Sequence, residues 1–402
     1  MTILKGGPKE PHTSMMQLIL GQSDDIDPSA AMHKAMEQCL QGLNGKTPNV
    51  IFFFTSIMDM DHQAALDTLK DGFSGAPLIG CTTAGEFSSL MGSTEDSVLL
   101  ALICSDTLSF WTGKGYPLSS DPNAALRQAL SRKKKKKADI ALYLSFLDGI
   151  QGLKVSINDT LNQFPFQGIP VFGGISGDKL CFTNTLQFKD QEVLTDAVAS
   201  IAAQGPLLYG SSSAHGWQPI GRMGVVTHAI GNVVYEINFK PAFSFLSYYL
   251  QEDSREFLQF PLAVYRTPQP EYYPDYYLRY PCTWNAKEGW VAFSGQMLKE
   301  TLVRITIPGR RQLISAAHTA IEQAIANYPG KNPVMAFCVS GAVRPQVLGS
   351  LRNHEFSPFM SGRKTLLPYF GFYSFGEIST ASRQTASFCH CSSFTALVLG
   401  ED

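Results

Sequence analysis

Apolar residues along the chain alternate between helical spacing and short continuous runs. Residues 28–42 and 62–69 carry apolar side chains at helical spacing. Residues 49–55, 77–81 and 97–104 form continuous apolar runs, which are typical of strands buried on both faces of a sheet. Because helices and buried strands alternate along the sequence, this part of the chain predicts an α/β fold.

The next helical pattern begins at Pro122 and runs into a cluster of cations. It ends in Arg132 and five consecutive lysines at residues 133–137. Cations at the C-terminal end of a helix complement its dipole. We interpret this run as a solvated helix end rather than a surface for an anionic partner. Residues 138–146 then form another apolar run that predicts a buried strand.

A hairpin pattern lies near the middle of the chain. Residues 222–230 and 233–239 flank Gly231-Asn232, a dipeptide suited to the positive φ angles of a two-residue turn. A helical pattern follows from Pro241 to residue 250, and we interpret this region as a hinge between two halves. Residues 268–280 are rich in tyrosine and proline, which predicts a loop.

The C-terminal part returns to the earlier alternation. Residues 310–327 predict a helix, and strands are predicted at residues 290–293, 302–307, 333–339, 369–378 and 386–399. No short-period repeat is evident, although both halves alternate strands with helices. The whole pattern predicts an α/β protein of two lobes with mixed, mostly buried sheets flanked by helices, with a division into residues 15–222 and 223–400.

Composition narrows the class of protein. The chain has 402 residues, of which 44% are hydrophobic and 16% charged, and its formal net charge is -2. This length suits more than one domain, and the charge balance indicates no nucleic-acid partner. Eight cysteines are scattered, mostly in apolar runs, which favours free thiols in a reducing compartment. No signal peptide or membrane-spanning stretch is apparent, so we expect a cytoplasmic protein without direct membrane insertion.

Two glycine-rich loops and one cysteine pair are candidate sites. Residues 80–86 (Gly-Cys-Thr-Thr-Ala-Gly-Glu) follow a strand, so Thr82 and Thr83 with nearby amides could bind a polar ligand or could stabilise a tight turn. Residues 173–178 precede no helical pattern, which excludes a dinucleotide-binding loop. The Cys389-His390-Cys391 spacing does not match a zinc knuckle.

Histidines provide the candidate ligands for a cofactor. His215, followed by Gly216 and Trp217, could line a pocket, bind a carboxylate or ligate a metal or haem iron. The alternative is a histidine satisfied at a strand end. His228 in the hairpin and His354 in a loop-like segment are further candidates.

Catalytic chemistry receives little support from the sequence. Neither a Gly-x-Ser-x-Gly nucleophile elbow nor a His-Glu-x-x-His motif occurs. Cys81 or Glu377 could serve an enzyme, but Glu377 is better explained as the anchor of a loop. We therefore expect no catalytic residues and a binding protein rather than an enzyme.

Several segments together resemble the FIST family of two-part sensory domains, FIST N and FIST C. The resemblance rests on residues 79–86, 172–178, 215–217 leading into 225–227, 231–237 with Pro241-Ala242, and 371–378. Cys338, Arg344 and Leu348-Gly349 also fit the C-terminal half. The match extends from about Asn49 to Thr395.

The resemblance implies a sensory protein that binds a small ligand and acts in trans on a signalling partner, such as a histidine kinase or a cyclic-di-GMP enzyme. One branch of the family is similar to haem-based nitric-oxide sensors, which makes haem an expected cofactor, with His215, His228 or His354 as its ligand. The alternative is a small organic ligand such as an amino acid, with Arg344 pairing a carboxylate. The expected ligand-binding residues are His215, Trp217, Arg344, Tyr373, Glu377, Thr82 and Thr83.

Overall fold

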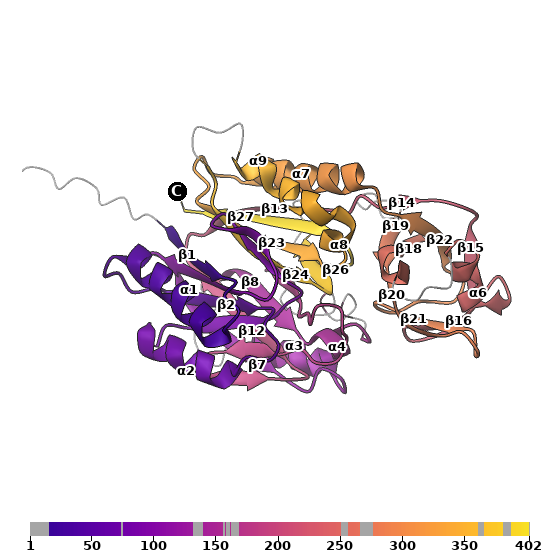
Figure 1. The fold of residues 1–402 in the computed structure, drawn as a ribbon, viewed down its shortest axis with the longest axis horizontal. Helices are drawn as coiled ribbons and strands as arrows, with labels where there is room; N and C mark the ends of the chain where they lie inside the picture. The colour runs from indigo at the N-terminus through magenta and orange to yellow at the C-terminus, as the bar shows by residue number, and fades with distance from the viewer. Residues whose placement is uncertain are drawn as a thin grey trace, which may run out of the picture.

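The computed structural model has two unequal lobes, a large body and a smaller lobe beside it (Figure 1). It describes residues 16–73, 75–131, 140–155, 157, 161, 169–250, 256–265, 276–360, 366–380 and 387–401. The smaller lobe is an insertion near residues 217–307, and the other described residues build the body. None of the described helices is long and apolar enough to cross a membrane.

The body consists of three structural repeats. The first contains β1 (Gln17–Ser23), α1 (Pro28–Leu43), β2 (Val50–Thr55), α2 (His62–Gly72), β3 (Leu78–Thr82), β4 (Glu86–Ser88), β5 (Gly92–Thr94) and β6 (Val98–Cys104). The second contains β7 (Ser109–Gly115), α3 (Pro122–Leu130), β8 (Ile140–Leu147), α4 (Gly149–Gly152), β9 (Val171–Ile175), β10 (Gln187–Lys189), β11 (Glu192–Leu194) and β12 (Val198–Gln204).

The third repeat has the same order of strands but is interrupted. It contains β13 (Leu208–Ala214), α7 (Arg310–Asn327), β23 (Met335–Gly341), α8 (Arg344–Leu348), η2 (Gly349–Phe356), α9 (Ser357–Met360), β24 (Tyr369–Ser374), β25 (Gly376–Thr380), β26 (Ser387–His390) and β27 (Phe394–Gly400). The smaller lobe is inserted between β13 and α7.

The two-stranded hairpin of each repeat (β4-β5, β10-β11 or β25-β26) joins the sheet of another repeat. The three sheets have the orders β1-β6-β2-β3-β10-β11, β7-β12-β8-β9-β25-β26 and β13-β27-β23-β24-β4-β5. In each sheet the first four strands come from one repeat and the last two from another. The exchange is cyclic, because the first repeat completes the third sheet, the second completes the first, and the third completes the second.

The continuous apolar runs follow from burial on both faces of each sheet. Phe52 and Phe54 of β2 point to one face, into a shared core where the Phe54 ring lies 5.2 Å from Phe146 of the second sheet and 4.7 Å from Phe372 of the third. Phe53 points to the opposite face, toward the helices α1 and α2. This alternation is the period of two expected of a strand.

Equivalent glycines mark the repeats. A side-chain carbon built on Gly80, Gly173 or Gly371 would lie 1.7, 2.0 or 1.9 Å from the carbonyl oxygen of its neighbour on the adjoining parallel strand. Those neighbours are Phe53, Ser145 and Cys338, each paired in register with its glycine. The third strand of every repeat therefore needs glycine at this position.

The smaller lobe is a strongly curved sheet around its own core. Its elements are β14 (Gln218–Pro219), β15 (Gly224–Ile230), β16 (Val233–Ile237), β17 (Lys240–Pro241), α6 (Ala242–Ser247), η1 (Glu256–Gln259), β18 (Leu262–Tyr265), β19 (Tyr276–Arg279), β20 (Pro281–Asn285), β21 (Trp290–Phe293) and β22 (Leu302–Ile307). The main path begins at β19 and ends at β20. These two strands are separated only by Tyr280, so the ends of the sheet meet at one residue.

The predicted fold class, mixed α/β with buried sheets and flanking helices in two lobes, is confirmed. The hairpin around Gly231-Asn232 is also present, as β15 and β16, but it lies inside the smaller lobe rather than at a hinge between halves. The lysines at residues 133–137 and most of the tyrosine-rich loop lie outside the described residues. The division at residues 222 and 223 falls within the inserted lobe and stays a sequence-based prediction.

Two predicted strands were too long. The strand expected at residues 369–378 is broken at Phe375, where the chain leaves the third sheet as β24 and enters the second sheet as β25. The strand expected at residues 386–399 is broken between His390 and Phe394 for the same reason, because β26 and β27 belong to different sheets. An apolar run does not indicate which sheet receives each part of it.

Candidate functional site

Three loops meet where the parallel strands of the three repeats end. The amide of Gly177 donates to the Thr82 carbonyl at 2.9 Å, so the second repeat is tied to the first. The Phe375 amide donates to the Ile175 carbonyl at 3.1 Å, and the Ala84 amide donates to the Tyr373 carbonyl at 2.9 Å. We call these three bonds the loop ring. They close a cycle in which each repeat binds the next.

The loops of the first and third repeats are built in the same way. Thr83 accepts a hydrogen bond from the Gly85 amide, and Ser374 accepts one from the Gly376 amide, both at 3.1 Å. Each hydroxyl also bonds the glutamate that follows, Glu86 or Glu377. Thr83 and Glu377, both predicted ligand residues, therefore have a shared structural role in fixing the start of a hairpin.

The second repeat has an amide where the other two have a carboxyl. Gln187 pairs with Cys81 in the sheet as Glu86 pairs with Phe372 and Glu377 with Gly174, each one residue beyond the equivalent glycine. All three side chains are fully buried. The Gln187 amide nitrogen donates to Ser176 at 3.1 Å, as expected for the same position in the loop.

Burial opposes ionisation of the two glutamates. It raises the pKa of Glu86 to about 7, although hydrogen bonds from Ser97, Thr83 and Ser56 act in the opposite direction. Burial also raises the pKa of Glu377 well above its ordinary value, opposed by the Ser393 amide that donates to Oε2 at 2.8 Å. The Oε1 atom of Glu377 has no partner among the described residues, which suits a protonated carboxyl or a ligand contact.

Arg344 occupies a fully buried site that belongs to the third repeat alone. Its Nε and Nη2 atoms donate to Oε1 of Glu355, which is also fully buried, at 2.8 and 2.5 Å. Nη2 also donates to the Leu313 carbonyl at 2.8 Å, and Nη1 donates to the carbonyls of His215 and Ser392 at 2.7 and 3.4 Å. The N–H groups of the guanidinium are thus engaged by the protein itself.

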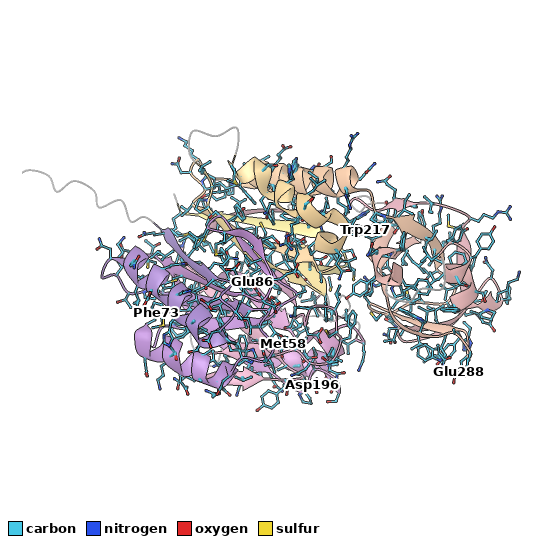
Figure 2. All side chains as sticks on the ribbon, viewed as in Figure 1. Met58, Phe73, Glu86, Asp196, Trp217 and Glu288 are labelled. Carbon is cyan, nitrogen blue, oxygen red and sulfur yellow. The ribbon has the colours of Figure 1, made fainter. Side chains whose placement is uncertain are left out.

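His215 and Trp217 lie beside this buried pair, where the body meets the smaller lobe; Figure 2 labels Trp217 at this boundary. The Trp217 ring lies 5.6 Å from the Arg344 guanidinium, and its indole nitrogen donates to the Gln259 carbonyl at 2.9 Å. The His215 ring lies 5.1 Å from that of Tyr276. Burial and the charge of Arg344 lower the pKa of His215 to about 4, so the imidazole is neutral at pH 7.

A second buried arginine, Arg279 of β19, lies at the same boundary without an acidic partner among the described residues. Its side chain is 7% exposed. Nη1 donates to the Leu278 carbonyl at 3.1 Å and to the Cys391 sulfur at 3.4 Å, while Nε has no partner within the part of the chain that the structure describes. Burial lowers the pKa of Arg279, but Cys391, Tyr277 and Cys389 together raise it above its ordinary value, so the guanidinium stays charged.

The junction is tied together by contacts from both lobes. The Tyr280 hydroxyl donates to the Phe375 carbonyl at 2.8 Å, next to the loop ring. Ser294 donates to the Cys391 sulfur at 3.3 Å, and the Gly295 amide donates to the Leu153 carbonyl of the second repeat at 2.9 Å. A movement of the Arg279 side chain would therefore affect contacts in both lobes.

The remaining predicted residues are distributed over several places. Thr82 is buried and accepts a hydrogen bond from the Leu186 amide at 3.0 Å. The Tyr373 hydroxyl donates to Ser93 at 3.1 Å from a fully buried ring. His228 is exposed on the smaller lobe and stacks on Tyr235, and His354 is exposed on η2. The structure brings His215, Trp217 and Arg344 together, with Glu377 nearby, and leaves the other two histidines elsewhere.

Cys81, considered for an enzyme, is fully buried, and burial raises the pKa of its thiol. Glu355, Arg279 and Gln187 were missed by the sequence analysis. The paired spacing Gly80-x-x-Thr83-x-Gly85-Glu86 and Gly371-x-x-Ser374-x-Gly376-Glu377 could have revealed the repeat. Nothing near Arg279 in the sequence marks it as a buried charge. Among the described residues, no group of three His, Cys, Asp or Glu side chains is placed to hold a metal ion.

We expect Glu86→Gln to change how stability depends on pH. A carboxyl with a raised pKa binds its proton more tightly when folded, so the wild-type protein loses stability as pH rises from 4.5 to about 7. The variant lacks this loss, which amounts to roughly 3 kcal/mol for this shift. Urea unfolding from pH 4.5 to 8 should show the variant gaining relative to wild type across that window. Gln187→Glu adds a buried carboxyl, so this variant should lose stability relative to wild type over the same pH window. Parallel curves of stability against pH for all three proteins would contradict the assignment.

We expect Arg344→Met to destabilise the protein strongly because it leaves the Glu355 carboxyl buried without its cation. Breaking a buried pair in this way costs about 3–5 kcal/mol. Arg352 provides a matched control, because its ion pair with Glu95 at 2.6 Å is exposed, and Arg352→Met should cost about 1 kcal/mol or less. Urea denaturation measures both variants. Adding Glu355→Leu to Arg344→Met should recover part of the loss, and equal costs for the two arginines would refute a structural role for the buried pair.

Comparison with known proteins agrees with this architecture. A FIST N domain matches residues 49–240 and a FIST C domain matches residues 242–380. An uncharacterized protein of Methanocaldococcus jannaschii, MJ1623, is 30% identical over 210 residues, which is 48% of this chain and 39% of that protein. The chain thus matches well under half the length of this relative. FIST domains are associated with sensing in signal transduction. The chain is therefore a FIST protein, in which a FIST N domain is followed by a FIST C domain.

Proposed function

We propose that this protein is a sensory binding protein, not an enzyme, and that it responds to a small organic acid at the junction between the body and the smaller lobe. The observation that carries the proposal is Arg279, a buried guanidinium with an unpartnered Nε and no acidic partner among the described residues. A buried unpaired charge is costly, and its cost falls when an anion is bound. A guanidinium recognises a carboxylate through two parallel hydrogen bonds.

Arg279 is a better ligand residue than Arg344, the arginine that the sequence predicts for this role. The donors of Arg344 are engaged by Glu355 and by three carbonyl groups, so it would have to abandon these bonds to hold a ligand. Arg279 has an N–H group to offer. Arg344 instead supports the wall of the junction through the His215 carbonyl and the Trp217 ring.

The position of Arg279 supplies a mechanism for sensing. Arg279 and Ser294 come from the smaller lobe, whereas Cys391 and Phe375 come from the third repeat. A carboxylate held by Arg279 changes the balance of charge at a surface shared by both lobes. A ligand with different affinities for two lobe arrangements shifts the population between them, which a partner can detect.

The signal is passed in trans to a signalling protein, with a histidine kinase or a cyclic-di-GMP enzyme as the partner classes, in the cytoplasm. The smaller lobe exposes several large apolar side chains, which are available for contact with such a partner. These are Met223, Ile230, Phe239, Tyr248, Leu298 and Ile307, with Phe239 and Tyr248 at 84% and 82% exposure.

A thermal-shift screen of small mono- and dicarboxylates, each beside its primary amide, tests the proposal. We expect at least one carboxylate, but not its amide, to raise the melting temperature of the wild type by roughly 2–5 °C when in large excess over Kd. Arg279→Gln should abolish this shift. Arg304→Gln is the matched control, because Arg304 lies on β22 of the same lobe and donates to the Gly221 carbonyl. A shift that persists in Arg279→Gln, or a response to amides alone, would refute the proposal.

Haem is a second candidate because His215 is a neutral imidazole whose Nδ1 lacks a partner among the described residues. A neutral ring nitrogen is the form that ligates iron, and bound haem would supply gas-sensing chemistry. His228 and His354 fit this role less well because both are exposed.

Titration with haemin separates the two candidates. We expect no saturable Soret band in the wild-type protein, because the proposed ligand is an organic acid. A saturable Soret band that is lost in His215→Ala, but kept in His228→Ala and His354→Ala, would replace the organic acid with haem. Absorption spectroscopy of the four proteins gives the answer, and circular dichroism of His215→Ala confirms that the variant is folded.

A further inference from the structure

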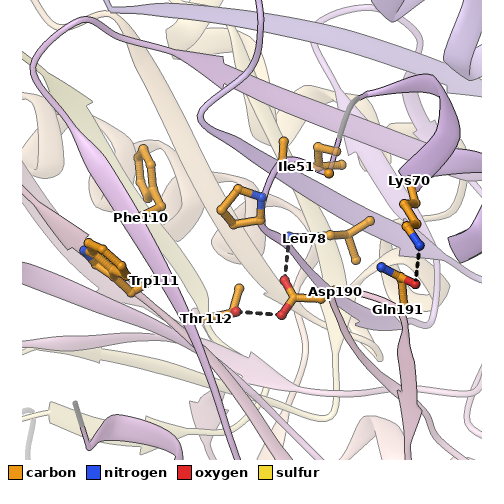
Figure 3. A pocket seen from close by; sticks show the side chains of 11 residues that line it. Ile51, Lys70, Leu78, Phe110, Trp111, Thr112, Asp190 and Gln191 are labelled. Atoms are coloured by element: carbon orange, nitrogen blue, oxygen red, sulfur yellow. Dashed lines mark hydrogen bonds between the residues drawn. The ribbon is translucent and has the colours of Figure 1, made fainter. Parts of the chain in front are cut away.

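A pocket of about 490 Å³ lies between the first and second repeats (Figure 3). None of the junction residues described above lines it. Residues at the start of β3, on β7 and in the turn between β10 and β11 line it. Its volume is within the range of small-molecule sites in proteins. The pocket is thus large enough for a compact organic molecule.

The two ends of the pocket differ in chemistry. Phe110 and Trp111 of β7 stand at one end and Lys70 of α2 at the other, as Figure 3 shows. Ile51 and Leu78 lie between them and supply an apolar wall. The Trp111 side chain is 49% exposed although it is large and mostly apolar. Aromatic side chains of this kind stack well on planar rings.

The two charged groups of the pocket are satisfied to different degrees. Asp190 accepts hydrogen bonds from Thr112 at 2.9 Å and from the Leu78 amide at 3.3 Å, and it forms an ion pair with Lys189 at 2.5 Å. Lys70 donates to the neutral amide oxygen of Gln191 at 2.9 Å, with no acidic partner among the described residues. The Lys70 ammonium therefore has donors left for a ligand, whereas the Asp190 carboxylate is paired with Lys189.

We propose that this pocket is a second binding site, for an amphipathic anion with a planar apolar body and one carboxylate. The apolar body packs on the Phe110 and Trp111 side, and the carboxylate receives a charge-assisted hydrogen bond from Lys70. The site is independent of the junction, since it uses neither Arg279 nor any residue of the smaller lobe. It would let the body bind a ligand of its own.

Isothermal titration calorimetry with 2-naphthoate, beside the neutral 2-naphthylmethanol, tests the site. We expect saturable binding of 2-naphthoate, weakened about tenfold in Lys70→Met, since a hydrogen bond to a charged group contributes on the order of that factor. Lys46→Met is the matched control, because Lys46 also donates to a glutamine side-chain oxygen, Gln17 at 3.0 Å, outside the pocket. It should bind like wild type, and the weak binding of the alcohol should not change in Lys70→Met.

Two further variants decide the outcome. Ala76→Phe, which fills the pocket, should abolish binding of 2-naphthoate while circular dichroism shows a folded protein. Arg279→Gln should leave it unchanged, so failure at the junction and failure here are distinguishable. Absence of saturable binding by wild type, equal weakening in Lys46→Met and Lys70→Met, or loss in Arg279→Gln would each overturn the proposal.

Discussion

The loop ring is the constraint on which the rest of the body depends. Each repeat contributes one amide and one carbonyl to a cycle of three hydrogen bonds, which lies where the parallel strands end. These groups are buried, and a buried backbone group without a partner is costly. Closing the cycle fixes where every hairpin starts, and each hairpin then crosses to another repeat's sheet. Because no repeat completes its own sheet, the three fold as one unit around the shared phenylalanine core.

The repeats provide an internal comparison within one chain. What recurs in all three, such as the glycine row at Gly80, Gly173 and Gly371, serves the fold. A residue that occurs in only one repeat is not explained by the shared fold. Arg344 stands six residues beyond the strand position Cys338, where the first and second repeats have Asp59 and Gln151. Buried charged side chains occur in every repeat, as Glu86 and Asp148 show, but among the described residues a fully buried ion pair is found only in the third repeat, between Arg344 and Glu355.

Much of the fold could be predicted from the sequence because its signals are local. Burial on both faces makes strands such as β2 continuously apolar, and aspartates cap the predicted helices, as Asp27 does for α1 and Asp121 for α3. The exchange of hairpins could not be predicted, because apolarity does not specify the sheet that a strand joins. The candidate site was only partly accessible from the sequence, and its role stays a prediction. His215, Trp217 and Arg344 do meet, but the burial of Glu355 and of Arg279, which has no acidic partner among the described residues, depends on long-range packing that spacing does not reveal.

The exchanged hairpins also mean that the boundary between the FIST N and FIST C matches is not a boundary of the folded body. A fragment of residues 242–380 would keep β23 and β24 but would lack β13 and β27 on one side and β4 and β5 on the other. Both edges of that parallel pair would be left without partners, and open strand edges promote association between chains. The two named halves are thus divisions of the sequence, and neither can be expected to survive dissection as a folded piece.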